Sequence, residues 1–244
     1  MSDRRYPHGT IAWTALETLE LDRARAFYRE LFGWSYAARD GAVLATVDAE
    51  PVATLREGPA KPAWIPFVAV GSVADAERRA MEGGARVVVS PATLPGAVTL
   101  DDPEGARFVV WDGRSGAHRL NAPGGLAWND LCAGDVERAM AFYQSVIGWG
   151  RRDLPQGSGS VYRMFAGRDD ANWTHGGTLP LSSGAAHWTS YFEVVDCRGS
   201  LERARTLGAA IDAPAIRVPG VGWIATFRDL DGAQVGLMQS VVVN

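Results

Sequence analysis

The spacing of apolar positions predicts an ordered series of helices and strands. Between residues 20 and 31, apolar side chains recur every three or four positions, which is typical of one face of a helix, and Gly33 follows as a helix-ending residue. Short apolar runs on either side alternate with polar residues, which is typical of strands. The first part of the chain is therefore expected to form a strand, a helix and three strands, at 10–17, 20–31, 34–38, 42–48 and 51–56.

The same order of elements is predicted three more times along the chain. The further segments, each given as strand, helix and three strands, are 64–70, 73–83, 85–89, 97–101 and 106–111; 126–132, 135–147, 149–153, 160–166 and 173–179; and 187–194, 199–207, 209–212, 222–228 and 233–239. The pattern favours an α+β fold built from four similar modules.

Particular residues also recur in order, which shows that the chain contains an internal duplication. The offset between matched residues grows from 115 to 127 positions, as expected if insertions fall in loops. The matched residues are Trp13 and Trp128, Phe27-Tyr28 and Phe142-Tyr143, Gly33-Trp34 and Gly148-Trp149, Trp64 and Trp188, and Asp102–Ala106 and Asp229–Ala233. We expect one domain at 8–112 and a second at 126–240, joined by a Gly-, Ser- and Pro-rich linker at 113–125.

Composition narrows the classes of partner. The 244-residue chain is 47% apolar and 21% charged, which is ordinary for a globular protein. Its net charge of −4, without a basic block, speaks against nucleic-acid binding. No segment has the apolar length of a signal peptide or a membrane span, and two unmatched cysteines, Cys132 and Cys197, do not indicate a disulfide framework. We therefore expect a cytoplasmic protein.

The modules and their motifs resemble the vicinal oxygen chelate superfamily, which includes glyoxalase I, extradiol dioxygenases, and bleomycin- and fosfomycin-resistance proteins. The resemblance rests on tandem βαβββ modules with Ala-Phe-Tyr on the first helix, Gly-Trp at its end and an Asp-x-x-Gly-Ala turn before the last strand. Trp128-Asn129-Asp130-Leu131 and His187-Trp188-x-x-Tyr191-Phe192 further resemble a tandem actinobacterial glyoxalase-like subgroup, often labelled "hydroxylase". The resemblance covers almost the whole chain. It implies that each repeat folds two modules into a U-shaped sheet or partial barrel around a cavity.

Enzymes of this superfamily usually hold a divalent metal with side chains from the first, fourth, fifth and eighth strands of each two-module unit. By spacing from the helix and the turn, the first, fifth and eighth strands hold Trp13, Ile65 and Val109 at these positions in repeat 1, and Trp128, Thr189 and Gly236 in repeat 2. The fourth-strand positions lie near Ala53 and Gly177. Tryptophan, aliphatic side chains and glycine do not bind a hard cation, and a single threonine hydroxyl is a poor ligand. We therefore expect no metal and no other cofactor. A displaced site built from His187, Glu193 and Asp130 is the alternative.

Strand alternation around these positions gives the other side chains expected to face the cavity. In repeat 2, four of them are able to bind polar groups or move protons and are the candidate catalytic residues: Asp130, His187, Tyr191 and Glu193. The candidate ligand-binding residues of both repeats are Trp128, Cys132, Thr189, Met238, Trp13, Glu17, Phe67 and Trp111.

Each candidate also has a structural interpretation. Trp13 and Trp128 either fill the space of a lost metal or form a stacking wall for a planar ligand. Asp130 is either a hydrogen-bonded structural acid or a general base, and His187 is either a partly solvated residue at a strand end or a proton-transfer group. Cys132 shows no sequence sign of activation and is expected to be a small buried thiol.

Two classes of function remain. The first is a metal-independent protein that binds an apolar or aromatic metabolite or natural product. The second is a metal-free isomerase, cyclase or lyase that uses the acid and base groups of repeat 2. A metal-dependent glyoxalase or dioxygenase with unorthodox ligands is the alternative to both. The expected partner is a small organic molecule, without nucleic acid or membrane, and the chain is expected to be a monomer or a homodimer.

Overall fold

A computed structural model describes residues 5–39, 42–58, 61–88, 96–114, 116–155, 161–167, 174–181 and 184–241. Residues 89, 160 and 173 of the predicted strands lie outside these ranges. Among the described residues, no helix is long and apolar enough to cross a membrane.

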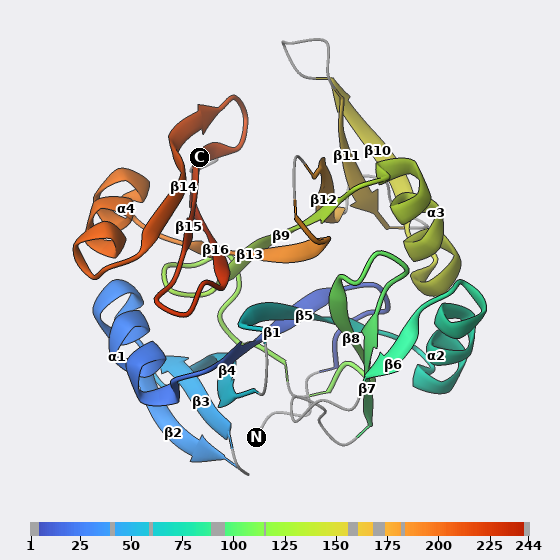
Figure 1. The fold of residues 1–244 in the computed structure, drawn as a ribbon, viewed down its shortest axis with the longest axis horizontal. Helices are drawn as coiled ribbons and strands as arrows, with labels where there is room; N and C mark the ends of the chain where they lie inside the picture. The colour runs from blue at the N-terminus through green and yellow to red at the C-terminus, as the bar shows by residue number, and fades with distance from the viewer. Residues whose placement is uncertain are drawn as a thin grey trace. The chain divides into compact units, whose positions relative to one another are not determined.

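The described residues form the predicted order of elements in both repeats (Figure 1). Repeat 1 contains β1 (Ile11–Thr18), α1 (Leu21–Phe32), β2 (Ser35–Arg39), β3 (Ala42–Val47), β4 (Glu50–Glu57), β5 (Ala63–Ala69), α2 (Val73–Glu82), β6 (Arg86–Val88), β7 (Ala97–Asp101) and β8 (Arg107–Trp111). Repeat 2 contains β9 (Leu126–Ala133), α3 (Val136–Ile147), β10 (Gly150–Pro155), β11 (Val161–Ala166), β12 (Thr174–Pro180), β13 (His187–Glu193), α4 (Cys197–Thr206), β14 (Ala210–Val218), β15 (Gly222–Arg228) and β16 (Gln234–Ser240).

Local signals explain where the first helix of each repeat ends. Gly33 and Gly148 follow α1 and α3 with φ of 72° and 82°, in the left-handed region that glycine adopts without strain. Asp135 begins α3 by accepting a hydrogen bond from the backbone N–H of Arg138. These ends agree with the predicted helices to within one residue.

Two of the differences from the sequence prediction have a local explanation. Helix α4 begins at Cys197 rather than at residue 199, because Asp196 accepts hydrogen bonds from the backbone N–H groups of Arg198 and Gly199 and so caps an earlier start. Strand β14 runs to Val218 rather than ending at 212. Register shifts against β15 carry it past Pro214, and a proline that interrupts an apolar pattern conceals such a strand.

Each repeat forms one open eight-stranded sheet. This confirms the predicted α+β fold, in which each of the two repeats contains two similar modules. The strand orders are β2-β3-β4-β1-β5-β8-β7-β6 and β10-β11-β12-β9-β13-β16-β15-β14. The pairs β1–β4, β5–β8, β9–β12 and β13–β16 are parallel, while the outer strands pair antiparallel. Because each order ends in two edge strands, neither sheet is a closed barrel.

The compact units of the chain do not coincide with the repeats. Unit 1 comprises residues 1–12, 66–116 and 129–189, and unit 2 comprises residues 13–65, 117–128 and 190–244. Each unit therefore takes one module from each repeat. Within unit 1, α2 packs against α3, and within unit 2, α1 packs against α4 (Figure 1). The domain boundaries 8–112 and 126–240 follow the sequence repeats and stay predictions.

In unit 2, a buried hydrogen-bond chain joins the first helix of repeat 1 to the last turn of repeat 2. The Tyr28 hydroxyl donates to Asp229 Oδ2 over 2.7 Å and accepts from Trp64 Nε1 over 3.0 Å. Asp229 Oδ1 accepts from two backbone N–H groups of its own turn. Burial, followed by the charge of Asp229, raises the pKa of Tyr28 well above its ordinary value.

Unit 1 contains the reciprocal chain. The Tyr143 hydroxyl, on the first helix of repeat 2, donates to Asp102 of repeat 1 over 3.1 Å and accepts from Trp188 Nε1 over 3.1 Å. The matched Ala-Phe-Tyr, Trp and Asp-x-x-Gly-Ala motifs of the sequence are thus one structural device, used twice, that connects modules of different repeats.

The same turn also caps the start of helix α1. Asp231 Oδ2 accepts hydrogen bonds from the Thr18 hydroxyl and from the backbone N–H groups of Leu19 and Glu20. The side chain of the N-cap residue Glu20 makes no capping hydrogen bond, so the carboxylate of Asp231 caps the helix instead. In unit 1, Glu104 binds the backbone N–H groups of Gly134 and Asp135 in the same way.

Candidate functional site

The first group of candidate residues lies on β9 in unit 1, around Asp130. Asp130 is 5% exposed, and its Oδ1 accepts a hydrogen bond from the Tyr162 hydroxyl of β11. Between these strands, Gly177 of β12 stands opposite Asp130 in the parallel register. A Cβ at Gly177 would collide with the Tyr162 hydroxyl and ring. Tyr162 therefore occupies the space in which a side chain at position 177 would lie.

Tyr162 was not among the residues predicted from the sequence. Its strand is assigned by the alternating pattern, but only the pairing of β11 with β12, and of β12 with β9, places its hydroxyl at Asp130. The glycine at position 177 was the one signal available, because a glycine inside a strand often marks the close approach of another group.

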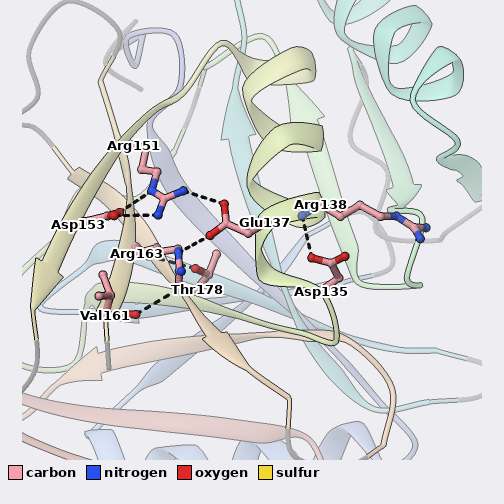
Figure 2. Close-up of polar contacts among 8 residues, drawn as sticks. All are labelled: Asp135, Glu137, Arg138, Arg151, Asp153, Val161, Arg163 and Thr178. Atoms are coloured by element: carbon pink, nitrogen blue, oxygen red, sulfur yellow. Dashed lines mark hydrogen bonds and ion pairs between the residues drawn. The ribbon is translucent and has the colours of Figure 1, made fainter. Parts of the chain in front are cut away.

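The neighbouring strand segment is held by ion pairs with α3. Figure 2 shows the guanidinium groups of Arg151 and Arg163 both directed at the carboxylate of Glu137, with Arg151 also bound to Asp153. The Glu137 contacts measure 2.7 and 2.8 Å. Such partly exposed pairs contribute roughly 1 kcal/mol or less each. Their effect is to fix β10 and β11 against the helix next to Tyr162.

Cys132 and Thr189 are brought together with Asp130 in unit 1. The Thr189 side chain is 1% exposed, and its hydroxyl has no hydrogen-bond partner among the described residues. Burial, followed by the charge of Asp130, raises the pKa of Cys132 to about 11. Cys132 is half-buried rather than buried, and its raised pKa disfavours the reactive thiolate near neutral pH.

His187 lies at the start of β13 and is partly exposed. Its Nδ1 is 2.9 Å from the carbonyl oxygen of Ala185. A carbonyl only accepts, so Nδ1 carries the proton and neutral His187 presents the lone pair of Nε2. Nε2 is buried and has no hydrogen-bond partner among the described residues. Nε2 is thus a base without a partner in the described part of the chain.

Tyr191 and Glu193 lie in unit 2 and not in the unit of Asp130 and His187. The Tyr191 ring lies over Gly236 of β16, its partner in the parallel register, and a Cβ at Gly236 would collide with that ring. Glu193 accepts hydrogen bonds from the backbone N–H and the hydroxyl of Ser240, at 2.8 and 2.7 Å. Glu193 thus serves to hold β16, beside Met238, its 9%-exposed partner in the register.

The candidate residues of repeat 1 are more apolar than those of repeat 2. Two polar side chains that were not predicted from the sequence, Thr54 and Arg56, lie beside them. Trp13 is 2% exposed and donates from Nε1 to the Thr54 hydroxyl over 3.3 Å. Glu17 is 4% exposed and stands opposite Arg56 in the parallel register of β1 and β4. In unit 1, Phe67 packs edge-on against Trp111 with ring centroids 6.3 Å apart.

Trp128 differs from its counterpart Trp13. It is half-buried on β9, whereas Trp13 is buried. The two matched tryptophans therefore differ in exposure, and only Trp128 presents part of its side chain at the surface of the described residues.

The residues at the superfamily's metal positions do not fit a metal ion. The register pairs Thr54 with Ala15 as it pairs Gly177 with Asp130, so the fourth-strand position of repeat 1 is Thr54 and not Ala53. Its hydroxyl is bound to Trp13. In repeat 2, tyrosine rings cover both glycines, Gly177 and Gly236.

No displaced metal site replaces them within the described part of the chain. There, no group of three or more His, Cys, Asp or Glu side chains is arranged to hold a metal ion. The alternative set of His187, Glu193 and Asp130 is not found there as a metal-binding group. Asp130 and His187 lie in unit 1, whereas Glu193 lies in unit 2.

Comparison with known proteins agrees with this architecture. A family model described as glyoxalase-like domain matches residues 13–111, and one described as glyoxalase/bleomycin resistance protein/dioxygenase superfamily matches residues 125–237. The chain belongs to this superfamily, also called the vicinal oxygen chelate superfamily.

Individual relatives cover nearly the whole chain. The putative glyoxylase CFP32 of Mycobacterium bovis is 30% identical, over 93% of this chain and 94% of its own length. The anthracycline biosynthesis protein DauV of a Streptomyces species is 25% identical, over 96% and 94%. Among solved structures, the Mn(II)-bound glyoxalase from Novosphingobium aromaticivorans shares the fold with a TM-score of 0.68, at 15% identity, over 95% of this chain and 82% of that one.

Proposed function

We propose that this protein binds an apolar or aromatic small molecule without a metal ion. The observation that carries the proposal is the pair of tyrosine rings, Tyr162 over Gly177 and Tyr191 over Gly236, at two positions where the superfamily places metal ligands. A metal-binding side chain introduced at Gly177 or Gly236 would collide with a tyrosine ring before it reached a metal ion. The half-buried Trp128 would then contact the molecule.

The relatives support the class of ligand. One is named for anthracycline biosynthesis, and an anthracycline contains fused planar rings. Planar rings stack on tryptophan and tyrosine with offset or edge-to-face geometry. We further propose that the protein acts in the cytoplasm as a monomer or a homodimer.

The first experiment measures metal content by elemental analysis of protein purified without chelators, together with thermal melting in added Mn²⁺, Fe²⁺, Ni²⁺ and Zn²⁺. The expected result is less than stoichiometric metal and no rise in melting temperature. Stoichiometric metal would overturn the proposal and favour glyoxalase or dioxygenase chemistry. A glyoxalase of this fold that binds Mn²⁺ serves as the positive control.

The second experiment measures ligand uptake by quenching of tryptophan fluorescence with a panel of planar aromatic compounds. Trp128→Ala is expected to weaken binding at least about tenfold, because an aromatic contact of roughly 1.5 kcal/mol or more is lost. Trp149→Phe is the matched control, since Trp149 is buried and bound to the Gly9 carbonyl. Equal quenching in Trp128→Ala and the native protein would contradict this role.

A second candidate function is proton transfer by Asp130, Tyr162 and His187, which all lie in unit 1. It is favoured by the Tyr162–Asp130 hydrogen bond, which sets a hydroxyl donor beside a buried carboxylate, and by Nε2 of His187, which has no hydrogen-bond partner among the described residues. The step would be an isomerisation, cyclisation or elimination.

On a confirmed substrate, Asp130→Asn and Tyr162→Phe are expected to lower kcat at least about a hundredfold while changing KM little. His187→Ala tests which of Asp130 and His187 is the base, because a single proton abstraction requires only one of them. If all three variants kept full turnover, the assignment of acid and base roles to Asp130, Tyr162 and His187 would be wrong.

A further inference from the structure

Arg56 is the residue in unit 2 whose surroundings demand an explanation. It is 6% exposed on β4, yet its Nε has no hydrogen-bond partner among the described residues. A buried guanidinium carries five donors, and leaving donors without acceptors is costly. Burial lowers the pKa of Arg56, and only the charge of Glu17 is identified as opposing that shift.

The fold itself does not need this pair of charges. Repeat 2 has Cys132 and Leu179 facing each other in the register where repeat 1 has Glu17 and Arg56. A buried ion pair is often no more stabilising than apolar residues of similar volume. The charged pair in repeat 1 therefore calls for a role beyond stability.

Two side chains that can donate hydrogen bonds lie on the same face of β4. Thr54 and Arg56 are two residues apart and so share one face of the strand. The Thr54 oxygen already accepts from Trp13, which leaves its own proton to donate. The Trp13 indole beside them supplies an apolar surface. A ligand here would need an oxygen acceptor on an apolar or aromatic body.

Charge decides which acceptor fits. Glu17 stands opposite Arg56, so the pair is neutral before a ligand arrives. An anion would bring a buried excess negative charge, whereas a carbonyl oxygen would fill the donors without one. We propose that Arg56 and Thr54 form a second binding site, separate from the Asp130–Tyr162 site, for the carbonyl oxygen of a neutral apolar or aromatic molecule.

The test observes Arg56 directly. Protein labelled with ¹⁵N-arginine gives side-chain Nε–H resonances in NMR spectra, and Arg56→Lys identifies the Arg56 signal by its loss. The three probes are acetophenone, benzoate and ethylbenzene, which share an aromatic ring and differ in the acceptor. Acetophenone is expected to shift the Arg56 signal saturably, with an affinity at least about tenfold above that of benzoate. Ethylbenzene is expected to leave the signal in place.

The matched variant is Glu17→Cys with Arg56→Leu, which gives repeat 1 the pair found in repeat 2 and avoids an uncompensated buried carboxylate. It is expected to fold and to lose acetophenone binding in repeat 1, measured by the shift of the Trp13 indole N–H signal. An unmoved Arg56 signal, an equal shift with ethylbenzene, or stronger binding of benzoate would each overturn the proposal. The inference rests on the proposed function, since it adds a second site for the same class of ligand. An unmoved Arg56 signal would overturn this site alone, whereas stoichiometric metal or unchanged binding in Trp128→Ala would count against the proposed function and leave the Arg56 signal unaffected.

Discussion

Cys132 is the side chain whose reactivity the site controls most directly. Burial and the charge of Asp130 both disfavour its thiolate. Cys197, which is buried near Asp196, has a pKa raised to about 11 by burial first and is the internal comparison. Cys197 thus combines burial with other charged neighbours, Asp196, Arg198 and Glu193, in place of Asp130.

We predict that Asp130→Asn increases the alkylation rate of Cys132 by several-fold at pH 8, because it removes a negative charge beside the thiolate. Iodoacetamide labelling followed by peptide mass spectrometry measures the rate, and Cys197 is expected to remain unchanged. Equal rates at Cys132 in the two proteins would show that Asp130 does not act on the thiol.

The sequence identified one partner of most of these contacts but rarely both. Asp130, Glu17 and Trp13 follow from alternation along the first strand of each repeat, because alternation needs no knowledge of neighbouring strands. Their partners, Tyr162, Arg56 and Thr54, depend on the register between strands. A shift of one residue in register reverses the face of every side chain, and no local signal fixes it for parallel pairs.

At the level of elements, helix α1 is fixed by its tyrosine. The Tyr28 hydroxyl takes part in two buried hydrogen bonds, to Asp229 and from Trp64. By contrast, the Tyr36 hydroxyl on β2 is buried without a hydrogen-bond partner among the described residues. The same loss of one oxygen atom is therefore expected to have different effects at the two positions.

Tyr28→Phe is predicted to lower the free energy of unfolding by about 2–3 kcal/mol, because it leaves two buried polar groups unpaired. Tyr36→Phe is predicted to be neutral or stabilising. Urea denaturation of both variants measures the difference. A similar loss in both would mean that the hydrogen bonds of Tyr28 contribute nothing beyond burial of the ring.

The pH dependence of this contact has a definite sign. Burial raises the pKa of Asp229 above its ordinary value of 3.8, while hydrogen bonds from Tyr28 and the backbone partly oppose the shift. The folded state therefore binds this proton more tightly than the unfolded state does. The contribution of Asp229 to stability is present in full below 3.8 and decreases as pH rises through the raised value.

Asp229→Asn is accordingly predicted to remove part of the fall in stability as pH rises from 3.8, apart from a constant offset caused by the altered hydrogen bonds. The measurement is the free energy of unfolding as a function of pH in both proteins. Parallel curves would indicate that Asp229 has the same proton affinity in the folded and unfolded states.

The order of elements was predictable because each module has its own helix spacing and glycine stop, as at Gly33 and Gly148. Exchange of modules between the repeats was not, because it depends on contacts between residues such as Tyr28 and Asp229, 201 positions apart. The sequence displayed both motifs without indicating that they bind each other.

For the whole molecule, this exchange predicts how the chain responds to a cut. Unit 2 contains segments from before and after the linker, as does unit 1. A site-specific protease sequence inserted at the exposed turn of Asn121 is predicted to allow cleavage without separation of the fragments. Size-exclusion chromatography of the cleaved protein is expected to show a single species with the mass of the intact chain.

An uncut protein carrying the same insertion is the control for damage by the insertion itself. Separation of the fragments in native buffer would show that each repeat is self-sufficient, contrary to the division of the chain into its two compact units.

The reciprocal tyrosine–aspartate contacts also bear on how the two halves could change over generations. A substitution of Tyr28 or Tyr143, in the first helix of a repeat, removes a hydrogen bond to the last turn of the other repeat, at Asp229 or Asp102. Neither copy is free to alter these positions alone, so selection keeps them alike. The strand faces that hold Glu17 and Arg56 in one copy, and Cys132 and Leu179 in the other, are under no such mutual restraint. The duplication thus preserves a common frame while leaving each half open to acquire its own chemistry.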